Sequence, residues 1–217
     1  MVGSSQNEKI EKKLTTRDIN DAIENLLKKS SRIKISGLNG QDSIAVGIQR
    51  NVEITVEGNP GCFLGAFNQR AVITLHGNAS DYAGDTLLGG GLIILGKAGF
   101  GVGTCMNSGI IVVKGNVLGG VGFGMYGGTI IIDGNVEGNI GGGIGSGTLI
   151  ISGNLKGGFG AGHGSCEMFI GGKHDPPGTG LKEIPLSNRD VSKLTKYFQH
   201  YAIQASPGIF TKYRGEP

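Results

Sequence analysis

The chain has no tryptophan, only three cysteines and six prolines, and aromatic residues make up 6% of its 217 residues. Its net charge of +3 comes from interspersed acidic and basic residues. This argues against a nucleic-acid-binding surface, which needs a basic stripe with aromatic side chains. The longest apolar run, residues 89–95, is too short to cross a membrane. The polar, charged N-terminus is unlike a signal peptide, so we expect a soluble, cytoplasmic protein.

Glycine, in contrast, is abundant, and many of the 43 glycines recur at a fixed spacing. One series, here called the first ladder, repeats every 19 residues at Gly58, Gly77, Gly96, Gly115, Gly134, Gly153 and Gly172. A second ladder has the same spacing at Gly65, Gly84, Gly103, Gly122, Gly141 and Gly160. A short, constant repeat is typical of a solenoid, in which each coil buries its apolar face against its neighbours.

Apolar residues occupy fixed places relative to the first ladder. All fourteen positions that lie four and two residues before its glycines are apolar, from Ile54 and Val56 to Met168 and Ile170. This alternation is typical of a β-strand with both positions on one face. Further apolar side chains stand two and six residues after the glycines, so each coil points four side chains inward. We therefore predict an all-β solenoid, a parallel β-helix of about seven 19-residue coils over residues 52–173.

The glycines and the residues after them predict the turns of each coil. A 19-residue coil must turn sharply, and we expect the glycines at corners that need a positive φ. Asparagine, the next residue most tolerant of that conformation, follows the first ladder at Asn59, Asn78, Asn116, Asn135 and Asn154.

The segments on either side of the repeat carry helical patterns. Residues 1–14 are predicted to form a flexible tail, and Thr15 or Thr16 to be the N-cap of an amphipathic helix that reaches about Lys29. Residues 32–51 miss the 19-residue spacing, so we expect residues 15–51 to form this helix and an irregular capping coil with strand-like runs at 32–35 and 43–48. Residues 174–217 are predicted to form a linker, a second helix over about 188–202 and an extended arm.

An apolar stripe is expected on the outer face of the strands. Three residues before the ladder glycines, the pattern is Thr55 and Thr74 followed by large apolar side chains. These apolar residues are Ile93, Val112, Ile131, Ile150 and Phe169. An apolar patch of this size is usually covered. Two alternatives remain: one of the chain's own helices lies on the stripe, or these five residues form an interface with a partner protein.

Several segments imitate functional motifs. Residues 99–103 contain glycines spaced as in part of a dinucleotide-binding fingerprint, and residues 91–97 match the spacing of a phosphate-binding loop. Neither is followed by a predicted helix whose N-terminus would hold the phosphates. Cys62, Cys105 and Cys166 fall at different positions around the coil and form no CxxC pair, which predicts separate reduced thiols.

The titratable side chains do not predict an active site. The histidines are scattered, and His163 takes a position of the repeat that is otherwise apolar. Asp81, Asp85 and Asp133 have no acid, base or nucleophile near them in the repeat, although general acid–base chemistry needs such a partner. We therefore predict no catalytic, cofactor-binding or metal-binding residue in this chain, and no cofactor of its own.

The repeated glycine segments, such as residues 77–84 and 115–128, resemble those of the GXGXG family. This family includes the C-terminal domain of the glutamate synthase large chain and one of the subunits of formylmethanofuran dehydrogenase. The resemblance covers residues 15–173, and the leading stretches 16–20 and 37–41 look more like the glutamate synthase version. It implies a right-handed β-helix that carries no cofactor and no catalytic residue.

The resemblance implies a non-catalytic structural subunit of a glutamate synthase-like complex. There it would space the amidotransferase subunit and the FMN and iron–sulfur synthase subunit during glutamate biosynthesis and ammonia assimilation. The corresponding GXGXG component of a molybdenum or tungsten formylmethanofuran dehydrogenase is the first alternative. An autonomous β-helix hydrolase or acyltransferase is the second, although left-handed acyltransferases use coils of 18 residues. A homo-oligomer is compatible with each of these roles.

Overall fold

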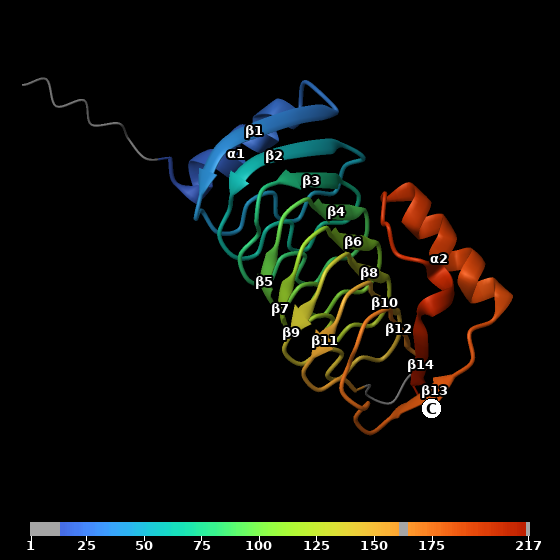
Figure 1. The fold of residues 1–217 in the computed structure, drawn as a ribbon. Helices are drawn as coiled ribbons and strands as arrows, with labels where there is room; N and C mark the ends of the chain where they lie inside the picture. Colours follow the sequence, from blue (N-terminus) through green and yellow to red (C-terminus); the bar gives the residue numbers. More distant parts are fainter. Residues whose placement is uncertain (1–13, 161–164, 216–217) are drawn as a thin grey trace, which may run out of the picture.

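A computed structural model describes residues 14–160 and 165–215 and shows a β-solenoid flanked by two α-helices (Figure 1). Its coils stack in sequence order from the N-terminal helix α1 to the C-terminal strands. The larger sheet has ten strands. In spatial order they are β1 (Arg32–Asn39), β2 (Glu53–Asn59), β3 (Val72–His76), β4 (Gly91–Ile94), β6 (Ile110–Val113), β8 (Thr129–Ile132), β10 (Thr148–Ile151), β12 (Glu167–Ile170), β14 (Thr211–Gly215) and β13 (Leu181–Ile184).

A smaller sheet of four strands forms a second side of the solenoid from β5 onward. It contains β5 (Ala98–Phe100), β7 (Val117–Gly119), β9 (Val136–Glu137) and β11 (Leu155–Lys156). On a third side, the described residues form isolated parallel bridges, which join Val121 to Ile140 and Ile140 to Phe159. The strands of successive coils pair in parallel from β1 to β12, which confirms the predicted β-solenoid.

The strand register repeats the spacing of the sequence. Ile54 pairs with Ile73, which pairs with Leu92, so residues 19 apart lie directly above one another. The side chains predicted to point inward are buried in one continuous apolar core. An additional buried column consists of Leu87, Met106, Met125 and Ile144. The polar Asn68 also lies in this column, where its amide bonds the backbone of Ala71 and Gly89 and leaves no polar group unsatisfied.

The first glycine ladder serves close packing. The expected positive φ is found at Gly58 (117°) and Gly77 (157°) but not at the five later glycines of this ladder. A Cβ atom on Gly115, Gly134, Gly153 or Gly172 would lie 2.5–2.9 Å from the carbonyl oxygen of the ladder glycine one coil earlier. The φ angles of these four glycines are outside the left-handed region. Glycine is needed there because the backbones of adjacent coils approach too closely for a side chain.

Five of the six glycines of the second ladder occupy the left-handed region, and Gly160 is the exception. Gly65, Gly84, Gly103, Gly122 and Gly141 have φ angles of 66–68°. The turns around them also place other residues at positive φ, namely Phe63, Phe67, Tyr82, Thr86 and Cys105, with φ angles of 49–62°. The sequence analysis expected glycine and asparagine at such positions and did not predict these five residues there. The surrounding coil contacts must offset the strain of holding non-glycine residues there.

The asparagines after the first ladder have a different role from the one predicted. None of the five has a positive φ. Instead, the Oδ1 atom of each accepts a hydrogen bond of 2.8–2.9 Å from the backbone N–H one coil later, as Asn116 does from Asn135 and Asn154 does from Lys173. Their side chains thus continue the hydrogen bonding between coils at the corner where the strand ends.

Helix α1 (Thr16–Leu27) covers the N-terminal end of the solenoid (Figure 1). Thr15 is its N-cap and forms a capping box with Asp18, within the pair of residues predicted for this role. Ile19, Ile23 and Leu27 are buried in the core. Asn20 donates to the carbonyl of Ser43 and accepts from the amide of Ala45, so its side chain satisfies the backbone of the first coil.

The first coil is more regular than expected in one part and less regular in another. Strand β1 is longer than the predicted run and pairs with β2 in parallel. Residues 43–48 form no strand, contrary to the prediction. Their backbone still bonds the next coil, since the amides of Ser43 and Gly47 donate to the carbonyls of Cys62 and Ala66.

The C-terminal segment folds back onto the solenoid. It contains β13, helix α2 (Asn188–His200), a short 3-10 helix η1 (Pro207–Ile209) and β14. The predicted arm is β14, which pairs antiparallel with β12 and covers the last coil. The predicted tail, residues 1–14, lies outside the described residues apart from Leu14. Within the described part of the chain, neither helix has the length and apolar character needed to span a bilayer.

Replacing a glycine of the first ladder should destabilise the fold strongly. In Gly134→Ala, the new Cβ would meet the backbone of Gly115 at 2.7 Å, so the coils must separate. We expect a loss on the order of 3 kcal/mol, measured by chemical denaturation. Gly208→Ala is the matched control because no atom lies within 4 Å of its Cβ position. Equal stability of the two variants would contradict close packing as the role of the ladder.

Candidate functional site

The structure places the candidate interface beneath the chain's own C-terminal segment. Val112, Ile131, Ile150 and Phe169 are fully buried, and Ile93 is partly buried at the margin of the same cluster. The side chains that cover them come from α2 and the segment after it: Leu194, Phe198, Ile203 and Phe210. The first alternative therefore holds, and the expectation of a partner interface made of these five residues is corrected. We call residues 181–215, which cover the stripe, the C-terminal clasp.

The sequence of α2 explains why it lies on the stripe. Ser187 and Asp190 form a capping box that begins the helix, and Leu194 and Phe198 lie on one face at helical spacing. At the other end, Lys114 holds the helix terminus. Its Nζ donates to the carbonyls of Tyr201 and Ala202, both at 3.0 Å, and also pairs with Asp133 at 2.5 Å. A cation near the last carbonyls of a helix is favourable because the helix dipole is negative there.

A cluster of charged residues holds the other half of the clasp. Lys212 of β14 is 3% exposed, and its Nζ lies 2.6 Å from Asp190 and 2.7 Å from Glu167. Glu167 also pairs with Lys193 at 3.1 Å and with Arg214 at 3.2 Å. The ammonium groups of Lys193 and Lys212 lie 5.6 and 5.2 Å from the centre of the Phe169 ring. These contacts join β12, β14 and α2 through charged and aromatic side chains.

The charged cluster shifts the acidity of both carboxylates. Burial alone would raise the pKa of Glu167, but hydrogen bonds from Lys212 and Lys193 outweigh it and lower that pKa to about 2. Burial would likewise raise the pKa of Asp190, but hydrogen bonds from Lys212 and Ser187 lower it to about 2. Both groups stay ionised at neutral pH and are tied to their cations, so the geometry supports a structural role better than proton transfer.

The carboxylates singled out from the sequence do not come together. Asp81 accepts a hydrogen bond from the amide of Phe100 at 2.7 Å, so it supports the next coil. Asp85 bonds the hydroxyl of Thr86 at 3.0 Å, and burial raises the pKa of its carboxyl despite this bond. Asp133 pairs with Lys114 and accepts from Ser152. Each carboxylate therefore has a local structural contact.

The cysteines and histidines are also dispersed. Cys62 is half-buried, Cys105 is exposed and Cys166 is buried, and all three are free thiols. His163 lies outside the described residues. Among residues 14–160 and 165–215, no three His, Cys, Asp or Glu side chains are grouped so that they could hold a metal ion. The glycine-rich segments 91–97 and 99–103 contain β4 and part of β5, and both belong to the solenoid wall.

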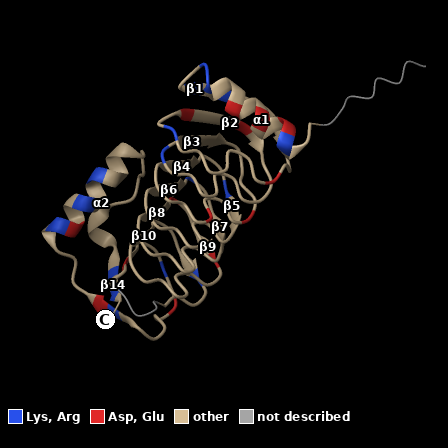
Figure 2. Ribbon diagram, turned by 180° about the vertical axis from the view of Figure 1, so that it is seen from behind, with Lys and Arg blue, Asp and Glu red and all other residues tan. Residues whose placement is uncertain are grey.

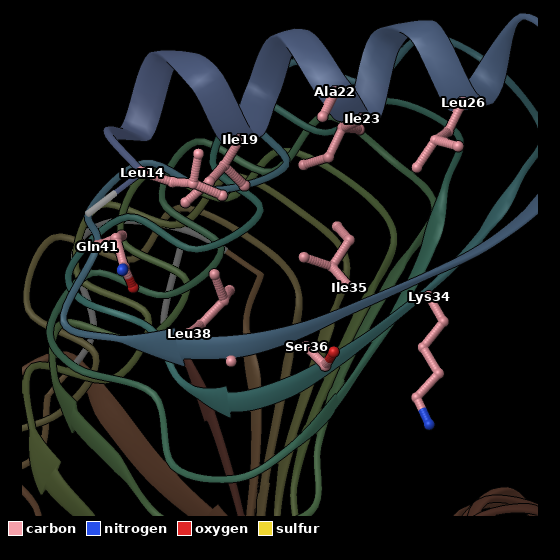
Figure 3. A pocket seen from close by; sticks show the side chains of 11 residues that line it. Leu14, Ile19, Ala22, Ile23, Leu26, Lys34, Ile35, Ser36, Leu38 and Gln41 are labelled. Atoms are coloured by element: carbon pink, nitrogen blue, oxygen red, sulfur yellow. The ribbon is translucent and has the colours of Figure 1, made fainter. Parts of the chain in front are cut away.

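A cavity of about 440 Å³ lies between α1 and β1 at the N-terminal end (Figure 3). Figure 3 shows Ile19 and Ile23 pointing down from the helix toward Ile35 and Leu38 of the strand. The remaining lining residues are Leu14, Ala22, Leu26, Lys34, Ser36, Gly37 and Gln41. Most of this lining is apolar, so the cavity offers a contact surface but no arrangement of groups for catalysis.

A second exposed feature is a row of aromatic rings across neighbouring coils, which we call the aromatic ridge. It consists of Phe63, Tyr82, Phe100 and Phe123, with successive ring centres 5.2, 6.2 and 5.8 Å apart. Phe100 lies against a glycine of the next coil, because a Cβ on Gly120 would be 2.6 Å from its ring. The repeat does not reveal the ridge, because Phe63 and Tyr82 share one position of it but Phe100 and Phe123 lie at two others.

Comparison with known proteins does not assign the chain to a family. No protein-family model and no curated protein matches this sequence.

Acid should release the C-terminal clasp before it unfolds the central coils. The pKa values of Glu167 and Asp190 fall from their ordinary values of 4.5 and 3.8 to about 2 in the folded chain. Their contribution to stability is therefore present above about pH 4.5 and is lost as the pH falls toward 2. Hydrogen exchange of α2 amides should accelerate over this window relative to β6 amides. Lys212→Met should weaken this pH dependence. Equal protection factors of the α2 amides at pH 5 and 2.5, after correction for the intrinsic pH dependence of exchange, would contradict the assignment.

Removing the anchor of α2 should expose the apolar stripe. In Leu194→Asp, a charge replaces a fully buried side chain that packs against the stripe, so the helix should detach. We expect greater binding of a hydrophobic dye and greater self-association by light scattering than for the unchanged chain. Gln199→Asp is the control because Gln199 is exposed on the same helix. If Leu194→Asp bound no more dye and self-associated no more than this control, the claim that α2 shields the apolar stripe would be wrong.

Proposed function

We propose that this chain is a non-catalytic structural subunit of a glutamate synthase-like complex, built as a right-handed β-helix. In this role it spaces an amidotransferase subunit from an FMN and iron–sulfur synthase subunit and contributes to glutamate biosynthesis and ammonia assimilation in the cytoplasm. The support comes from the resemblance of the glycine repeat and the leading segment to the GXGXG family. The chemistry of the complex belongs to the partner subunits.

The observation that carries the proposal is the continuous packing of the coils. Strands from β1 to β12 pair without a break, and the interior is filled by one apolar cluster. Seven coils spaced by about 4.8 Å make a rod roughly 30 Å long. Helix α1 covers the first coil, and the parallel stacking ends at β14, which pairs antiparallel with β12 and with the outer strand β13. Such a rod can hold two larger proteins at a fixed separation.

The surface that we propose for contact with a partner subunit is not the apolar stripe expected from the sequence. Because the clasp covers the stripe, the aromatic ridge is a better candidate for contact with another subunit. Phe63 is 38% exposed and Phe100 is 37% exposed, and their rings are already ordered by contact with neighbouring rings and backbone. Aromatic side chains held in this way bind with little loss of conformational freedom.

Purification from the native source tests the proposal. The tagged chain should recover stoichiometric amidotransferase and flavoprotein subunits, and adding it to separated partners should restore glutamine-dependent glutamate formation. Phe100→Asp should reduce partner recovery several-fold, whereas Leu95→Asp, a control at an exposed apolar position, should not. Recovery of a lone chain would contradict the proposal, and recovery of molybdenum or tungsten formylmethanofuran dehydrogenase subunits would support the first alternative instead.

A further inference from the structure

Positive charge gathers where α2 meets β14. Figure 2 shows several Lys and Arg positions along α2 and at β14. A cavity of about 370 Å³ lies at this junction. Its charged lining consists of Arg189, Lys193, Lys212, Arg214, Glu167 and Asp190. Four cations and two carboxylates leave a net charge of +2 in the lining of this cavity, on a chain whose total is +3.

Both carboxylates already form ion pairs or hydrogen bonds with other groups in the cluster. Glu167 contacts Lys193, Lys212 and Arg214, and Asp190 contacts Lys212 and the N-cap Ser187. Arg189, in contrast, makes no side-chain hydrogen bond or ion pair within the described part of the chain. Arg214 is 54% exposed and makes one bond, from a single guanidinium nitrogen. Two guanidinium groups that line the same cavity therefore retain free donors.

We infer that this cavity binds a small oxyanion, of the class of phosphate or a dicarboxylate. A guanidinium group presents a planar set of donors that matches carboxylate and phosphate oxygens, and Arg189 and Arg214 provide two such groups. The excess charge around the largely buried Lys212 favours an anion over a cation or a neutral ligand. The α2 terminus contributes little because Ser187 and Asp190 already cap it. Anion binding would link β12, β14 and α2 more tightly, independently of any partner subunit.

Titration of the isolated full chain tests this site. Inorganic phosphate and succinate are added separately at constant ionic strength, and backbone amide shifts are followed by NMR. We expect saturable shifts in residues 187–193 and 212–214, with a dissociation constant that rises with added sodium chloride. Arg189→Gln should weaken binding about tenfold, because it removes a charge-assisted contact without disturbing an existing ion pair. Saturation by only one of the two probes would assign the site to that class of oxyanion.

The controls separate a site from general charge attraction. Lys196→Gln removes the same charge from α2 at an exposed position outside the cavity lining, and it should leave the affinity unchanged. Arg214→Gln should weaken binding as Arg189→Gln does, with thermal melting used to verify that both variants remain folded. The inference is overturned if neither probe gives saturable shifts. Equal losses of affinity in Arg189→Gln and Lys196→Gln would also overturn it.

Discussion

The close approach of adjacent coils is the constraint on which the rest of this structure depends. At the first glycine ladder, the backbone of one coil lies against the carbonyl groups of the coil before it, and no Cβ would fit. This contact fixes the register, because a slip by one residue would move a side chain into the gap and turn the apolar columns away from the core. The asparagine side chains add hydrogen bonds at the same corner, so packing and polar contacts require the same 19-residue spacing.

A stack of parallel strands leaves two ends and an apolar outer stripe to be covered. The N-terminal end is covered by α1, and Asn20 replaces some of the backbone contacts that a further coil would provide. The C-terminal end is covered by β14, whose antiparallel direction interrupts the stacking. The clasp also buries the outer stripe. Apolar contacts of Phe198 and ion pairs of Lys212 and Lys114 hold the clasp on the solenoid. The coils in the middle of the solenoid need no capping helix or strand, because each of them has a neighbouring coil on both sides.

The sequence predicted the solenoid well because the spacing of its glycines and strands is a local, repeated property. Ile54, Ile73 and Leu92 were placed in one column by counting alone, and they stack as expected. The role of Asn116 could not be derived in this way, because its bond goes to a backbone group 19 residues later. Backbone tolerance of asparagine suggested a turn, whereas contact between coils determines its conformation. The positive φ angles of Phe63 and Tyr82 were not predicted for a similar reason, since neither residue type has a strong intrinsic preference for positive φ.

The candidate site was harder to predict because it depends on how distant segments fold together. The pattern of Val112, Ile131 and Ile150 showed that a cover was needed, but only the structure shows that α2 supplies it. The cluster of Glu167, Asp190 and Lys212 joins three elements whose contact no local pattern indicates. The same is true of the aromatic ridge, because Phe100 and Phe123 lie outside the repeat position that Phe63 and Tyr82 share. Sequence periodicity therefore defines the scaffold, while the surfaces open to partners follow from how its ends and sides are covered.

Amide hydrogen exchange across the whole chain tests the central claim, that contact between successive coils determines the fold, most directly. Protected amides should recur every 19 residues between β2 and β12, with the slowest exchange in the middle coils, where each strand has a neighbour on both sides. Protection without this period, or a set of fast-exchanging amides in the middle of the ten-stranded sheet, would contradict the account.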